Sequence, residues 1–349
     1  RRPSAAVAAT LRPVDGETRA RTGGDGPRPP EPVSPGEIPG GYRLERTNAR
    51  NIHLLLPLFR EVSGRDVTVD YLLRKYTTPW TKDGWFHGYM ALDRAGRVVA
   101  HQTGVPFRFR FGDRLVLGAQ SCDTMTAAEL RGKGIFTILG AKVDQLLAEE
   151  GFAFVFGFTN ENSLAAFTKK LGYRYLDTMK GYRLRVRTLP LERICRRLRF
   201  PYRAYLSLVD RAFRSLRIGE PVPSSCIGPG TAGVVRDEAF YDYRGFSFNR
   251  RVRLAGVPLW FKLEAALCIG EIGEATEESF LGMIAALRRR CFWLGIDEVL
   301  FQASPGTRNE VLFARHFPAF DSWVALYKDL SGSVDVGTLK ATFGDLDSF

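Results

Sequence analysis

The hydrophobic and polar positions of the chain divide it into a short polar segment and two long segments with α/β character. Residues 1–40 contain eight of the nineteen prolines and six glycines, with almost no aromatic or large aliphatic side chains. A segment of this composition cannot bury enough apolar surface to offset its ordering entropy. We therefore predict a disordered N-terminal tail at residues 1–40, with folded structure beginning near Tyr42.

The first long segment combines runs with a period of two and runs with a helical period. In chain order it predicts a strand at 42–47, helices at 49–64 and 69–78, strands at 85–93, 97–112 and 114–127, a helix at 135–150, a strand at 152–158, a helix at 162–170 and one or two strands at 173–186. The strand at 152–158 is wholly apolar, which is typical of a strand covered on both faces. This order predicts a mixed α/β fold with a predominantly antiparallel sheet flanked by helices.

The second long segment repeats this order in weaker form. It predicts strand material at 260–273, a helix at 277–295, a strand at 297–305, a helix at 307–317 and a final strand at 322–330. One pattern occurs twice, at 152–173 and at 297–320. It consists of an apolar strand, a polar segment with an Asn, a helix and an aromatic residue after the helix. The repeat is one of pattern and not of identity, and it predicts two related halves.

A basic segment lies between the halves. Residues 183–217 contain eleven arginines against only Glu192 and Asp210, and so carry most of the net charge of +12. Five apolar residues recur there at helical spacing: Tyr205, Leu208, Val209, Ala212 and Leu216. The stretch 190–217 is either a linker helix that packs this stripe on one domain, or a patch for an anionic membrane surface or another polyanion.

The composition narrows the class of protein. With 349 residues the chain is long enough for about two domains, and no apolar run reaches the roughly 18 residues of a membrane span. The five cysteines and four histidines stand at unrelated spacings, which fits neither a disulfide framework nor a zinc site; the cysteines are Cys122, Cys195, Cys226, Cys268 and Cys291. We predict free thiols, no metal and a cytoplasmic location.

The stretch LRGKGIF, Leu130 to Phe136, lies between a predicted strand and a predicted helix. Its spacing fits neither of two familiar nucleotide loops. A Walker loop needs Ser or Thr after its Gly-Lys pair, and a Rossmann loop needs a third glycine where Thr137 stands. Small residues before a helix allow consecutive backbone N–H groups to face a phosphate. Taken alone, the loop is either an anion cradle or a tight turn without a ligand.

Two landmarks together resemble the GNAT (Gcn5-related) N-acyltransferase superfamily. Its acyl-CoA signature is Gln/Arg-x-x-Gly-x-Gly/Ala, which Arg131 and Gly134 match and from which Phe136 departs. Its second landmark is a strand that ends in an Asn-bearing loop, followed by a helix that runs into Lys-Leu-Gly. Residues 156–173, FGFTNENSLAAFTKKLGY, are similar to it. The resemblance covers about residues 42–186.

The resemblance implies the domain organisation. A GNAT acyl-CoA-binding domain is expected at 41–187, a basic amphipathic linker at 188–222 and a degenerate GNAT-like domain at 223–349. In the second half the corresponding stretch, IGEIGEATEESFLGM at 269–283, lacks an Arg-x-x-Gly loop and is acidic. We infer that the second half binds no CoA and helps to form the acceptor cleft or the structure.

The family resemblance also implies acetyl-CoA, or another acyl-CoA, as cosubstrate. Backbone N–H groups of the glycine loop would hold its pyrophosphate, and the preceding strand end would pair with the pantetheine like an extra strand. An Asn after the next strand would hold the pantetheine amide. The residues so implied are Thr124, Met125, Thr126, Arg131, Gly132, Lys133, Gly134, Ile135, Phe136, Asn160 and Asn162.

The resemblance also implies that an amine attacks the thioester directly, which requires a neutral amine, a stabilised oxyanion and a proton for the thiolate. Asp123 and Glu129 are the candidate bases, although Asp123 could instead serve a structural pairing, and a water chain could replace both. Many relatives place a tyrosine four residues before the glycine of the second landmark. Thr168 stands there, so it is the candidate acid beside solvent, and Tyr173 and Tyr175 are nearby phenols.

The acceptor is not encoded in a motif. The segment VDYLLRKYTTPW at 69–80 resembles a recurring segment of GNAT-like proteins with polysaccharide or cell-envelope functions, and 240–250 echoes it faintly. We predict an N-acyltransferase acting on a sugar or other small polar amine, without a specific nucleic-acid partner. Its alternatives are a Fem-like aminoacyl transferase and a non-catalytic acyl-CoA sensor.

Overall fold

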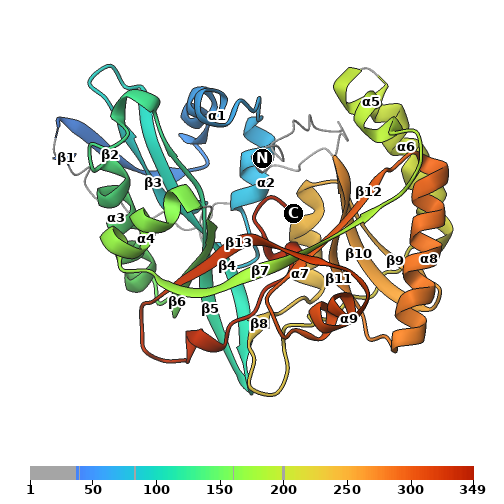
Figure 1. Cartoon of the computed structure of the whole chain (residues 1–349). Helices are drawn as coiled ribbons and strands as arrows, with labels where there is room; N and C mark the ends of the chain where they lie inside the picture. The colour runs from blue at the N-terminus through green and yellow to red at the C-terminus, as the bar shows by residue number, and fades with distance from the viewer. Residues whose placement is uncertain (1–36, 39, 82–83, 160, 199–200) are drawn as a thin grey trace, which may run out of the picture.

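The computed structural model describes residues 37–38, 40–81, 84–159, 161–198 and 201–349 (Figure 1). The predicted disordered tail at 1–40 lies almost wholly outside these residues. Within them, no helix is long and apolar enough to cross a membrane. The five cysteines are all unpaired, in agreement with the predicted free thiols.

The elements of the first half follow the predicted order. Its strands are β1 (Glu37–Ile38), β2 (Tyr42–Asn48), β3 (Trp85–Leu92), β4 (Val98–Phe111), β5 (Arg114–Thr126), β6 (Phe154–Thr159) and β7 (Arg174–Arg185). Its helices are α1 (Leu56–Ser63), α2 (Val69–Tyr76), α3 (Ile135–Glu149) and α4 (Glu161–Leu171), with 3-10 turns at Ile52–Leu55 and Ala128–Leu130. The helix expected at 49–64 is thus a 3-10 turn followed by a shorter α-helix, and the segment at 173–186 is one strand.

The remaining elements complete the second half. The helices are α5 (Leu191–Leu198), α6 (Tyr202–Phe213), α7 (Glu238–Tyr243), α8 (Glu277–Leu294) and α9 (Arg308–His316). The strands are β8 (Gly233–Val234), β9 (Asn249–Leu254), β10 (Val257–Glu264), β11 (Ala266–Ile272), β12 (Glu298–Ala303) and β13 (Ala319–Asp329). Short 3-10 turns lie at Arg214–Leu216, Arg244–Phe246, Val336–Thr338 and Phe343–Asp345.

One mixed sheet runs through both halves of the described chain. It has 13 strands in the order β1-β2-β3-β4-β5-β6-β13-β7-β12-β11-β10-β9, with β8 beside β4. The pairs β5–β6 and β11–β12 are parallel, and the other ladders are antiparallel, as the predicted fold class requires.

The two halves exchange their last strands. β7 ends the first half but pairs with β12, while β13 ends the second half but pairs with β6. β7 and β13 then pair with each other and cross the middle of the molecule in Figure 1. The central pair therefore has six strands on the side of β6 and four on the side of β12, and neither half completes its sheet without the other.

The basic segment forms two helices, α5 and α6, and not one. Four of the five residues of its predicted stripe are buried or partly buried, but Leu208 is 52% exposed. The prediction was wrong for Leu208, because α6 buries Tyr202, Tyr205, Val209 and Phe213 against the second half. That register turns Leu208 outward.

The C-terminal segment is held at the centre of the molecule, where Figure 1 places the end of the chain. Arg236 is fully buried and hydrogen-bonds Asp345 at 2.8 Å, while it also pairs with Glu271. The buried Arg244 donates to the carbonyl of Leu346 at 2.9 Å. Buried charges of this kind are tolerated only when they are paired, so these contacts fix the path of the segment.

Candidate active site

The parallel strands β5 and β6 separate before they end. Their last paired residues are Gln120 and Phe156, although β5 continues to Thr126 and β6 to Thr159. On its other side β5 stays paired with β4 as far as Thr126. The residues of β5 after Gln120 therefore present an unpaired edge to the gap. Such an edge can accept another extended chain.

A β-bulge reshapes β5 in this gap. Between the pairs His101–Met125 and Thr103–Cys122, β4 advances by two residues and β5 by three. The extra residue lies at Asp123, whose φ of +44° is unusual for a side chain other than glycine. Bulges and strained backbone of this kind are common beside functional sites.

His101 supports the bulge from β4. Its Nδ1 donates to the carbonyl of Asp123 over 3.1 Å. Complete burial lowers the pKa of His101 to about 4, so the ring is neutral at physiological pH. A neutral ring with a fixed Nδ1–H holds the carbonyl without adding a charge to the gap.

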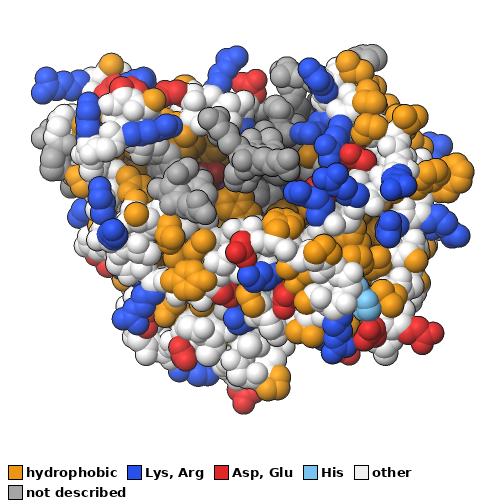
Figure 2. Space-filling view, in the orientation of Figure 1, with side chains coloured by type: hydrophobic (Ala, Val, Ile, Leu, Met, Phe, Trp, Pro, Cys, Tyr) orange, Lys and Arg blue, Asp and Glu red, His pale blue; other side chains and the backbone are white. Residues whose placement is uncertain are grey.

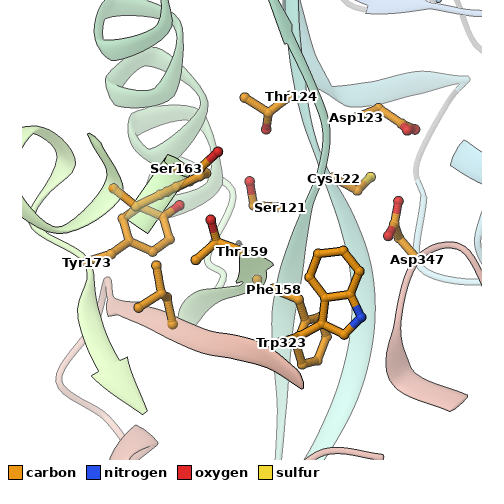
Figure 3. Close-up of a pocket in the computed structure, with 13 residues that line it drawn as sticks. Ser121, Cys122, Asp123, Thr124, Phe158, Thr159, Ser163, Tyr173, Trp323 and Asp347 are labelled. Carbon is orange, nitrogen blue, oxygen red and sulfur yellow. The ribbon is translucent and has the colours of Figure 1, made fainter. Parts of the chain in front are cut away.

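A cavity of about 200 Å³ lies over the gap. Figure 3 shows that side chains of β5, β6 and the exchanged strand β13 surround it, together with Ser163 of α4, Tyr173 just before β7 and Asp347 of the C-terminal segment. Its lining residues are Ser121, Cys122, Asp123, Thr124, Gly157, Phe158, Thr159, Ser163, Phe167, Tyr173, Trp323, Leu326 and Asp347. The second half thus contributes a wall of the cavity, through β13 and the C-terminal segment.

A second cavity, of about 360 Å³, adjoins the first. The two share Thr124 and Ser163. Its lining residues are Val62, Thr124, Thr126, Leu130, Arg131, Gly132, Gly134, Phe136, Thr137, Ser163, Ala166 and Lys170. Together the cavities form one path from the glycine loop to the bulge.

The glycine loop ends at the first turn of α3. Gly132 has φ +79° and Gly134 has φ +86°, a left-handed backbone that favours glycine. A Cβ on either residue would meet nothing within 4 Å, so the backbone conformation and not crowding demands glycine here. The first N–H groups of a helix lack carbonyl partners within the helix, and in α3 these groups belong to Gly134 and the residues after it.

The structure brings together only part of the predicted cofactor residues. Thr124, Thr126, Arg131, Gly132, Gly134 and Phe136 line the second cavity. Met125 and Ile135 are buried in the core, so only their backbones can contribute. Lys133 is exposed and does not line either cavity. Asn160, and the side chain of Asn162, lie outside the described part of the chain.

Asp123 forms a buried ion cluster with two residues distant in sequence. The Nζ of Lys75 lies 2.6 Å from the carboxylate of Asp123 and 2.8 Å from that of Asp347. Tyr76 also donates to Asp123, at 2.9 Å. Burial raises the pKa of Asp123, but the charge and hydrogen bond of Lys75 outweigh burial and lower it overall. Both carboxylates against one ammonium leave the cluster with one net negative charge.

The other predicted catalytic residues do not reach the cavity. Glu129 is exposed and pairs with Arg97 at 2.6 Å, and this hydrogen bond lowers its pKa. The hydroxyl of Thr168 donates to the carbonyl of Leu164 in its own helix at 2.9 Å. Neither residue lines the two cavities. Glu129 was a candidate because it is close to the loop in sequence, and Thr168 because the family resemblance places a tyrosine at its position, but an ion pair and an intrahelical bond direct the two side chains elsewhere.

Tyr173 is the phenol that lines the first cavity, whereas Tyr175 is exposed and bonds Thr178. The Tyr173 hydroxyl donates to Asp144 at 2.9 Å, and Lys328 of β13 binds the same carboxylate at 2.7 Å. Burial, together with the charge of Asp144, raises the pKa of Tyr173 well above its usual value. Tyr173 therefore stays a neutral phenol that can hydrogen-bond a ligand but holds its proton tightly.

Among the residues that sequence reasoning did not assign to the site, four bear a charge or an indole ring and lie in the two cavities or beside them. Trp323 lies at a bulge of β13, where two residues of β13 face one of β7. Lys170 adds a cation opposite the loop. Lys75 and Asp347 complete the ion cluster. Lys170 lies in the helix of the second landmark and Lys75 lies in the segment 69–80, so both had a local signal; Trp323 and Asp347 depend on long-range contacts alone.

Within the described residues one trio of potential metal ligands is close enough to share an ion. Their ligand atoms, on Cys122, Asp123 and Asp347, lie within 4.8 Å of one another. The ammonium of Lys75 already lies between the two carboxylates. A divalent cation would have to displace it, so the trio fits an ion pair better than a metal.

The second half contains a matching parallel pair, β11–β12, which separates after Ile269 and Phe301. Here the chain itself enters the gap. The N–H of Ser304 donates to the carbonyl of Ala341 at 2.8 Å, and the hydroxyl of Thr342 donates to Gly270 at 2.7 Å. The gap that is open between β5 and β6 is therefore closed by the C-terminal segment between β11 and β12.

Comparisons with known proteins agree with this geometry. Residues 46–176 match the family model described as an acetyltransferase (GNAT) domain. A comparison with curated proteins found no match. The glycine loop and the gap between β5 and β6 both fall within the matched residues.

Among solved structures, the chain is similar to a GCN5-related N-acetyltransferase from Kribbella flavida, with 14% identity, coverage of 83% of this chain and 71% of that one, and a TM-score of 0.50. A probable N-acyltransferase from Enterococcus faecalis, described as a conserved protein of unknown function, gives 11% identity, 83% and 73% coverage and a TM-score of 0.53. A GCN5-related N-acetyltransferase from Anabaena variabilis gives 14% identity, coverage of 83% of this chain and 73% of that one, and a TM-score of 0.52. At these identities the similarity establishes the fold.

Proposed function

Residues 46–176 are a GNAT acetyltransferase domain, and from this premise we propose that the protein transfers an acyl group, most simply acetyl, from CoA to the amine of a small polar acceptor. The observation that carries the proposal is the continuous path from the glycine loop to the bulge at Asp123. It combines a helix N-terminus for a pyrophosphate with an unpaired strand edge for an extended pantetheine.

The residues of the path divide between cofactor and acceptor. The amides after Gly134, with Arg131 and Lys170, face the second cavity and suit the phosphates of CoA. The free edge of β5 beyond Gln120 suits the pantetheine and the thioester. The first cavity, with Asp123, Trp323 and Asp347, then receives the acceptor.

The proposed reaction is direct transfer. The acceptor first loses a proton to solvent and attacks the thioester carbonyl as a neutral amine. The C–N bond forms and the C–S bond breaks, the nitrogen releases a second proton to solvent, and the released thiolate takes up one proton. Backbone N–H groups on the free edge of β5 are the donors available to the developing oxyanion. Because neither Glu129 nor Thr168 lines a cavity, the thiolate takes its proton from solvent in this proposal.

The net negative charge of the cluster suits an acceptor that arrives as an ammonium. Asp347 is the more exposed of the two carboxylates, at 31%, and lines the cavity. We expect Asp347→Asn to raise the KM for the amine about tenfold, because one charge-assisted hydrogen bond is lost. Steady-state kinetics against each substrate measure this, and the acetyl-CoA affinity should change by less than about twofold.

Asp321→Asn is the matched control. It makes the same substitution in the second half, at a residue that forms a surface ion pair with Lys180 and lines neither cavity. A tenfold effect of both variants, or an equal loss of acetyl-CoA affinity in Asp347→Asn, would contradict the assignment of Asp347 to the acceptor.

Acyl-CoA binding is the direct test of the proposed function. We expect acetyl-CoA to raise the thermal midpoint of the full chain, and thiol release to appear in a screen of amino sugars, polyamines and amino acids. No stabilisation by any acyl-CoA would overturn the proposal. Stabilisation without thiol release would favour the acyl-CoA sensor, and transfer from aminoacyl-tRNA alone would favour the Fem-like alternative.

In this proposal the second half helps to form the acceptor cavity of the first half. It supplies Trp323, Leu326 and Asp347 to the acceptor cavity, and its own strand gap is occupied by residues 341–342. The absence of a second CoA site and the degenerate GNAT-like character of 223–349 remain predictions. The parallel pair present in each half, β5–β6 and β11–β12, and the occupied gap support them.

A further inference from the structure

An apolar surface with arginines around it lies on the second half, away from the two cavities. It is formed by α5, the residues before it and the C-terminal end of α8. Its exposed apolar side chains are Leu189, Leu191, Ile194, Leu198, Phe292 and Trp293. We call these six residues the α5–α8 surface.

Two segments supply the six residues, and the start of one lies against the end of the other. The hydroxyl of Thr188 donates to the carbonyl of Phe292 at 2.7 Å, and the N–H of Glu192 donates to Gly295 at 3.2 Å. These bonds hold the start of α5 against the end of α8. Figure 2 shows hydrophobic and basic side chains intermingled over this edge of the molecule.

The outward face of α5 is consistently apolar. Leu191, Ile194 and Leu198 follow one another at spacings of three and four residues and therefore share one side of the helix. The inward side of α5 carries Glu192, which is 1% exposed and accepts from Ala265 at 3.1 Å. α5 is thus fixed to the protein by its polar side and turns its apolar side to solvent.

Trp293 is the most exposed of the six, at 76%. It stands four residues after Arg289, on the same side of α8. Within the described chain, Arg187, Arg197 and Arg289 are exposed and form no ion pair. Apolar side chains are therefore surrounded by cations whose charge is not compensated by the protein.

We propose that the α5–α8 surface binds an anionic membrane surface peripherally. Tryptophan, phenylalanine and leucine side chains would enter the boundary between headgroups and acyl chains, and the arginines would contact lipid phosphates. Two copies of this chain meeting face to face would instead oppose their unpaired arginines, which disfavours a symmetric dimer here. A nucleic acid would use the arginines but leave the aliphatic side chains exposed.

Flotation of the full chain with vesicles tests the proposal. We expect it to float with vesicles of equal parts phosphatidylglycerol and phosphatidylcholine, more weakly at high salt, and not with pure phosphatidylcholine. Arg197→Gln/Arg289→Gln should weaken binding roughly fivefold per arginine. Trp293→Ser/Leu198→Ser should weaken it about tenfold or more.

The control is Arg110→Gln/Leu115→Ser, which changes one exposed arginine and one exposed leucine that pair across the β4–β5 hairpin. It should bind vesicles like the unchanged protein, and all variants should keep their thermal midpoints because they are exposed. Absence of flotation at low salt would overturn the proposal. Equal weakening by the control, or a lipid-independent dimer that the Trp293 variant abolishes, would also overturn it.

Discussion

Gly134→Trp is expected to abolish measurable stabilisation by acetyl-CoA. Gly134 begins α3 with φ +86°, and the space around its Cβ position is open toward the second cavity. An indole there would fill the position proposed for the pyrophosphate and displace it from the helix N-terminus. Loss of two hydrogen bonds to a charged group, at roughly 1.5–3 kcal/mol each, corresponds to a loss of about 100-fold or more in affinity.

The matched control for this variant is Gly151→Trp, beyond the other end of the same helix. Gly151 has φ +83°, and nothing lies within 4 Å of its Cβ position. Both variants should be destabilised by a similar amount, roughly 1–2 kcal/mol, because both force a side chain into left-handed backbone. Calorimetry with acetyl-CoA separates them, and equal affinities of the two variants would show that the loop is only a turn.

Lys75→Met is expected to have the largest effect on stability. The ammonium of Lys75 is 2% exposed and is hydrogen-bonded to both Asp123 and Asp347. Its removal leaves a buried carboxylate without its cation, which typically costs about 3–5 kcal/mol. Urea unfolding at neutral pH measures this loss. The exposed pair of Lys180 with Asp321 provides the control, since Lys180→Met should cost at most about 1 kcal/mol.

The pH dependence gives this prediction a distinct signature. In the unchanged protein the pKa of Asp123 is lowered, because Lys75 outweighs the effect of burial. The pair therefore stabilises the fold above the unfolded Asp pKa of about 3.9, and this contribution is lost on acidification. Without Lys75, burial raises the pKa of Asp123 instead. The variant should then gain stability relative to the unchanged protein as pH falls, and a constant difference at all pH values would contradict the role of the charge.

Much of the fold followed from local pattern. The strands β3, β4 and β5 and the helices α3 and α8 begin and end close to their predicted limits, because glycines, turn residues or capping residues stand at their ends. The division of the helix predicted at 49–64 could not be read from the sequence. Its apolar residues form one continuous run, but Ile52–Leu55 has 3-10 hydrogen bonding and α1 has α-helical hydrogen bonding.

The site was predicted where its signal was local. The glycine loop combines two left-handed positions with a helix start, and only glycine adopts that backbone readily. Asp123 was a candidate from its position near the end of β5, but its partners were not. Lys75 is 48 residues from Asp123 in the chain and Asp347 is 272 residues from Lys75, so no spacing rule relates them.

The sequence by itself determined the order of the elements and the place of the glycine loop, because periodicity and glycine positions reflect local backbone and burial. Only the tertiary structure decided that β7 and β13 exchange between the halves. It also decided that Trp323 and Asp347 line the first cavity, and that the start of α5 lies against the end of α8. Strand pairing and ion clusters depend on contacts between segments far apart in the chain, and such contacts leave no local period to detect.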